Sequence, residues 1–270
     1  MKNNSNKIKT AIAALMVLVV VIISYFIIVY GMLRKTMEES IERDLYYGLS
    51  EYYNNNNFES AEKYFKRALF CEKYIVFWDD NLNLPICYQC MGLVYEGLEK
   101  YEKSTDMYEK SLSAYEKYLP DAAEDIALTE TKVSIIYSIL GDVDMVIEHA
   151  SAANDYYQSL PGQQQNINAG TAAIELANAY YNIGDYERAS QYFEIGIPII
   201  YDDLDWRMDD DLGPKLLVIS YKMAADTYGK LNNDEMQQYY EKEYNDIVWI
   251  REIDEDEIDE LMEYFHWGIE

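Results

Sequence analysis

The sequence predicts an all-α fold: a right-handed superhelical solenoid of stacked antiparallel helical hairpins that follows one N-terminal transmembrane helix. Four tyrosines recur at intervals of 43, 42 and 43 residues, at Tyr52, Tyr95, Tyr137 and Tyr180. A fixed period of this size is typical of stacked structural repeats. A long apolar run precedes these pivotal tyrosines, and no alternating apolar and polar pattern of useful length predicts a β-strand.

The apolar run extends from Thr10 to Leu33 without a charged residue. A helix over 11–33 would rise about 35 Å, which is enough to cross a hydrocarbon core of about 30 Å. A cleaved signal peptide is the alternative, but its apolar region would be shorter and would end in small residues. Residues 30–35 offer no such site, so the run predicts an uncleaved membrane anchor.

Basic residues flank the predicted anchor on both sides, with Lys2, Lys7 and Lys9 before it and Arg34, Lys35 and Arg43 after it. The positive-inside rule counts basic residues and therefore nearly balances the two sides. The free amino terminus and the short leading tail favour a cytoplasmic N-terminus. We therefore expect a single-pass membrane protein whose acidic body lies outside the cytoplasm.

The anchor and the repeats divide the chain into five expected segments: a basic tail at 1–10, the transmembrane helix at 11–33, a juxtamembrane stalk at 34–42, about five repeats at 43–252, and a C-terminal capping helix with an acidic tail at 253–270. Residues 36–43 form either a continuation of the helix or a short polar stalk. The fifth repeat is degenerate, because its tyrosine, Tyr228, follows Tyr180 by 48 residues. An amphipathic stripe, with Ile258, Leu261, Met262 and Phe265, suits a terminal cap.

Each repeat is expected to contain a helix that ends near its tyrosine, a turn, and a second helix that begins with a small residue and an aromatic one. The clearest copy runs from Leu176 to Phe193, with Gly184-Asp185 at the turn. Glycine tolerates the left-handed conformation that ends a helix, and aspartate caps the next helix. We assign a structural role to the repeat signature: Tyr52, Ala61, Phe65, Gly92, Tyr95, Tyr108, Tyr137, Gly141, Tyr180, Gly184, Ala189 and Phe193.

This signature resembles the tetratricopeptide-repeat family over about 43–246. The family's usual period is about 34 residues, and the longer spacing here is similar to the long-helix branch typified by kinesin light chain. Asn56-Asn57 and Glu99-Lys100 replace the Gly-Asp turn in two copies. The resemblance implies a concave groove lined by the first helix of each hairpin. Its expected residues, which we call the groove row, are Ser50, Tyr53, Leu93, Glu96, Ile135, Ser138, Asn178 and Tyr181.

The groove row contains no basic residue. The best-known chaperone-binding groove of the family uses lysines and arginines to clamp a C-terminal carboxylate, so we do not expect that ligand here. The net charge is −27, and the segment after the anchor carries 19 basic against 49 acidic residues. Such a field repels nucleic acid and anionic lipid headgroups, and it favours a neutral or basic protein or peptide.

No residue pattern predicts catalysis, a cofactor or a metal site. Cys87 and Cys90 lie on one helical face, but a zinc site needs two further ligands; packing is the expected role, with a disulfide from Cys71 to either as the alternative. His149 and His266 are expected to be ordinary surface or half-buried histidines. Three acidic runs, at 202–205, 209–211 and 254–260, lack the spacing of a calcium loop and are expected to be solvated.

The sequence therefore predicts a non-enzymatic, membrane-anchored protein that mediates protein–protein interaction as a scaffold or tether. A sensory input component of a signalling system is one alternative, and the same scaffold facing the cytoplasm is another. The bias toward lysine, asparagine, isoleucine and tyrosine suggests an AT-rich bacterial genome.

Overall fold

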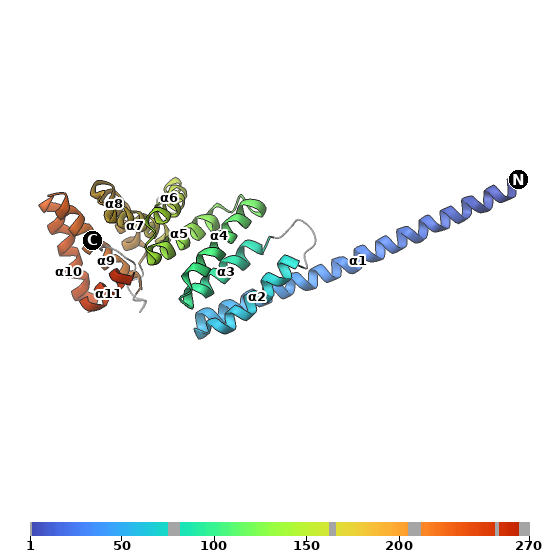
Figure 1. Cartoon of the computed structure of the whole chain (residues 1–270), viewed down its shortest axis with the longest axis horizontal. Helices are drawn as coiled ribbons and strands as arrows, with labels where there is room; N and C mark the ends of the chain where they lie inside the picture. The colour runs from blue at the N-terminus through green and yellow to red at the C-terminus, as the bar shows by residue number, and fades with distance from the viewer. Residues whose placement is uncertain (1, 75–81, 162–165, 205–211, 252–253, 265–270) are drawn as a thin grey trace. The chain divides into compact units, whose positions relative to one another are not determined.

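The computed structural model describes residues 2–74, 82–161, 166–204, 212–251 and 254–264. These residues form eleven α-helices and no β-strand (Figure 1), which confirms the prediction of an all-α stack of helical hairpins. They divide into two compact units, 1–90 and 91–270.

The first unit is a helical hairpin of α1 (Lys2–Asn55) and α2 (Phe58–Tyr74), followed by the beginning of α3 (Leu84–Gly97). Its core contains Ile41, Ala68 and Cys87. Phe65 of α2 is fully buried against Gly48 of α1. A β-carbon at Gly48 would lie 2.3 Å from the Phe65 ring, so the small residue permits the close approach of the two helices.

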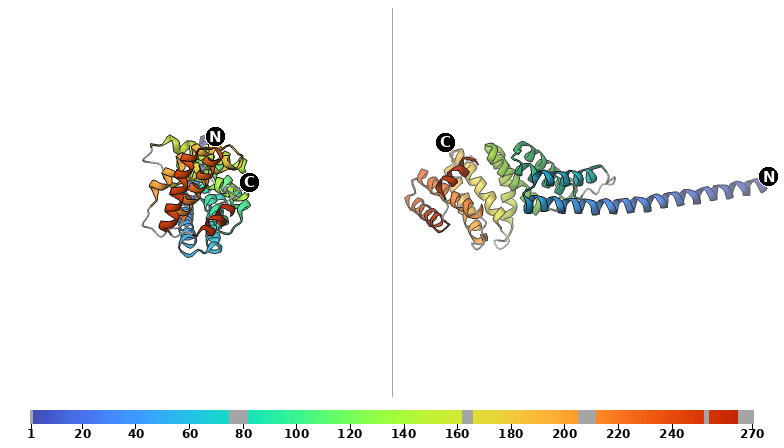
Figure 2. Two further views of the ribbon diagram at one scale, coloured as in Figure 1. Left: turned by 90° about the vertical axis from the view of Figure 1, so that its left-hand side faces the viewer. Right: turned by 90° about the horizontal axis from the view of Figure 1, so that it is seen from below.

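Helix α1 is one unbroken helix of 54 residues (Figure 2). Within the described residues, it is the only helix long and apolar enough to cross a membrane. The large apolar side chains from Leu15 to Ile28 are exposed. Of the two alternatives for 36–43, the structure has a continuous helix, and Ile41 is already part of the first hairpin's core.

The second unit continues as antiparallel hairpins in which consecutive helices pair. The end of α3 pairs with α4, because the Ser104 hydroxyl donates to the Gly92 carbonyl oxygen at 2.9 Å. The remaining helices are α4 (Tyr101–Tyr118), α5 (Ala123–Leu140), α6 (Val143–Ser159), α7 (Ile167–Asn182), α8 (Tyr186–Asp203), α9 (Leu212–Lys230), α10 (Asp234–Arg251) and α11 (Glu255–Tyr264).

Every hairpin turn has the same backbone geometry. The residue four positions after each pivotal tyrosine has a positive φ of 47–77°, and these residues are Asn56, Glu99, Gly141, Gly184 and Asn232. In the last four hairpins, the next amide donates to the carbonyl oxygen of the tyrosine, as from Asp185 to Tyr180 at 2.9 Å. This bond satisfies a carbonyl that the end of the first helix leaves free.

Side-chain caps begin most of the second helices. Asp142 and Asp185 each accept a hydrogen bond from the amide three residues later, and Asn57 and Asn233 do the same. Lys100, in the equivalent position of the second hairpin, makes no side-chain cap. Both unusual turns predicted from the sequence therefore have the expected backbone, but only one of them has a capping side chain.

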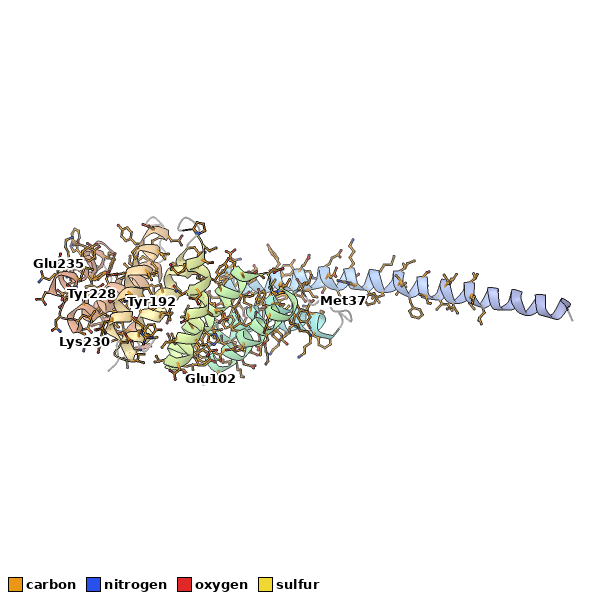
Figure 3. The ribbon with its side chains drawn as sticks, turned by 90° about the horizontal axis from the view of Figure 1, so that it is seen from above. Met37, Glu102, Tyr192, Tyr228, Lys230 and Glu235 are labelled. Carbon is orange, nitrogen blue, oxygen red and sulfur yellow. The ribbon has the colours of Figure 1, made fainter. Side chains whose placement is uncertain are left out.

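The repeat signature forms the packing between helices. Its small and aromatic members Ala61, Phe65, Tyr108, Ala189 and Phe193 are all fully buried. In the last three hairpins the pivotal tyrosine stacks on a ring twelve residues later, at centroid distances of 5.5–5.6 Å: Tyr137 on His149, Tyr180 on Tyr192, and Tyr228 on Tyr240. Figure 3 labels Tyr192 and Tyr228 among the side chains of the second unit.

The first helices of successive hairpins contact one another more extensively than the second helices do. Helix α5 contacts α7, and α7 contacts α9. In a curved stack, the closer helices line the inner side. The predicted groove is assigned to these same first helices.

The C-terminal helix α11 packs on α9. Ile258 is fully buried there, and Lys215 and Lys222 of α9 pair with Glu257 and Asp259 of α11. Phe265, the last member of the predicted amphipathic stripe, lies outside the described residues.

Candidate functional site

The groove row is shared between the two units. Ser50 and Tyr53 lie on α1 in the first unit, where Tyr53 is exposed and Ser50 is half-buried. The other six residues lie on α3, α5 and α7 in the second unit. Leu93, Glu96 and Ile135 are half-buried, whereas Ser138, Asn178 and Tyr181 are buried.

Two hydrogen bonds join the first helices of neighbouring repeats through the groove row. The Ser138 hydroxyl of α5 donates to the Glu175 carboxylate of α7. The Tyr181 hydroxyl of α7 donates to the Asp226 carboxylate of α9. A bond from a hydroxyl to a carboxylate is about twice as strong as a neutral one when the carboxylate is ionised. The row therefore fixes the spacing of three consecutive first helices.

Glu96 of α3 has a different partner. The Tyr108 hydroxyl of α4 donates to its carboxylate at 2.9 Å. This bond joins the two helices of one hairpin, and it holds a negative charge at the first-helix position that the sequence assigned to the groove.

Asn178 is the polar residue whose surroundings are most unusual. Its side chain is 1% exposed, and neither its amide oxygen nor its amide nitrogen has a hydrogen-bond partner among the described residues. A buried polar group without a partner costs about 1–3 kcal/mol of stability. Both atoms are closed off from solvent, so a polypeptide segment could pair with them only after a neighbouring side chain moves aside.

Glu175 and Asp226 are residues of this site that the sequence did not reveal. Glu175 lies three residues before Asn178 on the same helix face, and Glu175 is 1% exposed. Helical spacing could have drawn attention to Glu175. The partnership of Asp226 with Tyr181 depends on the register of adjacent repeats, which differs here because the spacing between Tyr180 and Tyr228 is irregular.

A second polar cluster surrounds His149 on α6. The His149 ring is 6% exposed, so the expectation of a surface or half-buried histidine is wrong. Its Nδ1 lies 2.6 Å from Glu130 of α5, and its Nε2 lies 3.2 Å from Glu109 of α4. Burial alone would lower the pKa of His149, but hydrogen bonds and charge attraction from the two glutamates raise this pKa to about 9. The imidazole is therefore charged at neutral pH and ties three helices together.

The cysteines lie in an apolar environment. Cys87 and Cys90 are buried and Cys71 is half-buried, all as free thiols. Burial raises the pKa of the Cys90 thiol to about 12 and also raises that of Cys87. Both thiols are therefore protonated at neutral pH, which suits packing rather than nucleophilic or metal chemistry.

No group of three or more histidine, cysteine or acidic side chains that could hold a metal occurs among the described residues. Asp202 and Asp203 of the first acidic run are exposed, as are the acids at 254, 256, 257, 259 and 260. Asp205, the run at 209–211 and His266 lie outside the described residues.

Comparison with known proteins identifies this fold. Residues 171–194 match the tetratricopeptide repeat. The fold is that of a tetratricopeptide-repeat protein. The matched segment contains Asn178, Tyr180, Tyr181 and the Gly184 turn. A search with the sequence against curated proteins finds no match.

Two solved structures share the tetratricopeptide-repeat fold with this chain. BtubC (BKLC) from P. vanneervenii has a TM-score of 0.62 and 16% sequence identity, and the alignment covers 83% of this chain and 92% of BtubC. A Podosopora anserina protein, named for kinesin light chain and for its nearly identical TPR-like repeats, has a TM-score of 0.57 and 13% identity. That alignment covers 80% of this chain and 96% of the other. Both likenesses concern the fold.

Proposed function

We propose that this tetratricopeptide-repeat protein is a non-enzymatic scaffold or tether, anchored in a membrane through α1, whose repeats lie outside the cytoplasm and bind another protein. The repeat fold supports protein binding, because stacked hairpins present an extended surface to a partner. The apolar segment of α1 supports anchoring by its length and composition.

The observation that carries this proposal is the unpartnered amide of Asn178. Helix α7, which carries Asn178, contacts the first helices α5 and α9 on its two sides. The nearby groove-row residues Ser138 and Tyr181 already donate hydrogen bonds to carboxylates. Because this amide is closed off from solvent, a partner would pair with it only after a neighbouring side chain of the groove moves aside. The main-chain donors and acceptors of an extended peptide segment would then satisfy both of its atoms.

The expected partner is neutral or basic. The net charge of −27 creates a negative field, and carboxylates occur at or beside the groove row in Glu96, Glu175 and Asp226. Charge complementarity raises the rate of association and disfavours nucleic acid and acidic partners. Anchoring adds a further gain, because it confines the binding site to the membrane surface.

The test of the groove uses two matched leucine substitutions in the full chain. Asn178→Leu removes the unpartnered amide of α7. Asn154→Leu is the control, because Asn154 is also buried, on α6, with an amide oxygen that lacks a partner. Crosslinking in intact cells should capture a partner with the wild type and the control, and at least about tenfold less with Asn178→Leu.

Neither substitution should lower the melting temperature, because each replaces an unsatisfied polar group by an apolar group of similar size. Equal capture with all three proteins, at equal expression, would exclude Asn178 from the binding surface. Loss of capture with both variants would indicate damage to the fold rather than to the groove.

The side of the membrane is tested by fusing to the C-terminus one reporter that is active only outside the cytoplasm and, separately, one that is active only inside. Activity outside supports the proposed orientation. Activity inside would reverse it and leave the scaffold facing cytosolic proteins.

A sensory input component is the second candidate, and the continuity of α1 favours it. The same helix carries the apolar segment and the first-repeat core residue Ile41. A movement of the apolar segment would therefore be transmitted along α1 to the first hairpin, and a movement of the hairpin would be transmitted to the apolar segment. Capture of a kinase or cyclase as the crosslinked partner would support this candidate over a simple tether.

A further inference from the structure

A cavity of about 460 Å³ lies between α4, α5 and α6 in the second unit. It shares no residue with the groove row. Four glutamates line it: Glu109 and Glu116 from α4, Glu130 from α5, and Glu148 from α6. His149 is the single basic residue in the lining, so the ionised cavity carries a net charge of −3.

The four carboxylates have two different roles. Glu109 and Glu130 contact the buried His149 ring. Glu116 and Glu148 are exposed, and neither pairs with a basic side chain in the part of the chain that the structure describes. The inner wall is therefore neutralised in part, whereas the outer carboxylates on α4 and α6 are available to a second cation.

His149 lies at the buried end of this cavity. Its Nε2 faces the Glu109 carboxylate at 3.2 Å, and its Nδ1 faces the Glu130 carboxylate at 2.6 Å. Both ring nitrogens are therefore already engaged by carboxylates of the lining, and Glu116 and Glu148 are the lining acids that remain for a guest. The raised pKa of His149 also shows that the site stabilises a positive charge more than burial penalises it.

Apolar residues complete the lining. Leu112 of α4, Ile126 of α5, and Pro120 between these two helices face the cavity together with the carboxylates. Such a mixed wall suits a guest with an aliphatic stem and a charged end. A hydrated metal ion would leave the apolar wall without a contact, and a purely apolar guest would leave the carboxylates unpaired.

We propose that this cavity binds an arginine side chain of a protein partner. The guanidinium contacts Glu116 and Glu148, and the methylene stem packs on Leu112 and Ile126. Arginine fits better than lysine, because its planar fork can pair with two carboxylates and is less strongly hydrated than an ammonium group.

The test measures binding of short peptides to the full chain in detergent micelles by calorimetry. The probe is acetyl-glycyl-arginyl-glycine amide, and the neutral analogue carries citrulline in place of arginine. The wild type should bind the arginine peptide at least about tenfold more tightly than the citrulline peptide, because charge-assisted hydrogen bonds depend on the cation. Equal binding of the two peptides would overturn the proposal, as would no binding of either.

Paired variants separate the cavity from the general field of the protein. Glu116→Gln with Glu148→Gln should weaken binding of the arginine peptide at least about tenfold. The charge-matched control is Glu102→Gln with Glu187→Gln, because both residues are exposed and lie outside the cavity (Glu102 is labelled in Figure 3). The control should bind like the wild type, and an equal loss in both pairs would overturn the assignment.

Two further probes fix the identity of the guest. A lysine peptide should bind more weakly than the arginine peptide, and spermidine should bind no more tightly than the arginine peptide. The opposite result with spermidine would assign the cavity to a free polyamine and overturn the proposal. Asn178→Leu should leave binding of the arginine peptide unchanged, so failure of the groove and failure of this cavity are distinguishable.

Discussion

Glu99 is the residue at which the backbone of a hairpin turn conflicts with its side chain. Its φ is 55°, in the left-handed region that glycine and asparagine tolerate best. The other turns use Gly141, Gly184, Asn56 and Asn232 at this position. A β-carbon and a long side chain cost free energy in this conformation, of the order of 1 kcal/mol.

Glu99→Gly should therefore raise the free energy of unfolding by up to about 1 kcal/mol, since relief of the left-handed strain exceeds the entropy that glycine adds to the unfolded chain. Asn56→Gly is the control and should change stability by less than about 0.5 kcal/mol, because asparagine already tolerates this region. Urea unfolding of the full chain in detergent micelles, followed by circular dichroism, measures both. A loss of stability in Glu99→Gly would show that the Glu99 side chain contributes an interaction larger than the strain.

His149 predicts a pH dependence of stability. Its folded pKa of about 9 exceeds the unfolded value of about 6.5, so the folded state binds the proton more tightly. The contribution to stability is therefore complete below about pH 6.5 and is lost as pH rises through about 9, with a total of about 3 kcal/mol.

His149→Gln should abolish this dependence, and the wild type and the variant should approach the same stability near pH 9. Unfolding by urea at pH 6, 7.5 and 9 compares the two proteins. An equal decline in both would assign the pH dependence to other groups.

At the scale of one hairpin, residues twelve positions apart face each other across the turn. Gly92 of α3 faces Ser104 of α4 in this register. A β-carbon at Gly92 would lie 2.7 Å from the fully buried Tyr108 ring. The pairing of a small residue on one helix with a ring on the other therefore sets the distance between the two helices.

Gly92→Ala should lower the free energy of unfolding by about 1–3 kcal/mol, because a rigid buried ring must shift to admit the methyl group. Gly229→Ala should instead leave stability unchanged or raise it by up to about 1 kcal/mol. At Gly229 the nearest atoms belong to the flexible end of Gln237, at 3.2 Å. Thermal unfolding of the two variants should therefore give changes of opposite sign or clearly different size.

The sequence pattern predicted the contents of each hairpin better than the contacts between hairpins. The pivotal tyrosines, the small residues and the turns lie within about 20 residues of one another, so helical period and turn chemistry determine them. The bond from Tyr181 to Asp226 spans 45 residues, and that from Ser138 to Glu175 spans 37. Such bonds depend on how successive hairpins pack, which local periodicity does not encode.

The burial of His149 is a further example of this limit. Its partners Glu109 and Glu130 come from the preceding hairpin and from the first helix of its own hairpin. Exposed glutamates are common on helices, and only the packing of three helices distinguishes these two. The sequence did not predict the burial of Asn178 for the same reason. Its place on the first helix could be predicted, because it precedes Tyr180 by two residues.

At the scale of the whole molecule, the net charge and the apolar N-terminal segment together affect which surfaces the protein can approach. An acidic chain with a net charge of −27 would repel other copies and anionic headgroups, while its apolar N-terminal segment favours a membrane. The first-hairpin core begins at Ile41, about 12 Å along the helix from Leu33 at 1.5 Å per residue. Under the proposed anchoring, the first hairpin therefore stands close to the membrane surface.

Because α1 is unbroken, the number of residues between the apolar segment and the first hairpin sets the direction in which that hairpin points around the helix axis. The proposed function should therefore depend on this number. Each residue inserted between Thr36 and Met37 would turn the first hairpin by about 100° around the α1 axis, and seven residues would nearly complete two turns. Two inserted alanines should therefore reduce capture of the partner in cells, whereas seven should largely preserve it. Equal capture with both insertions would mean that the partner does not sense the angle of the hairpin.

If the linker to the membrane were flexible, the repeat domain could take any orientation above the bilayer, and a partner could bind it from any direction. Under the proposed anchoring, the continuous α1 would instead hold the first hairpin at a fixed distance from the bilayer and at a fixed angle to each face of the spanning segment. A partner that also contacts the spanning segment would then meet the first hairpin in one orientation, so the anchor would help to set the geometry of the assembly.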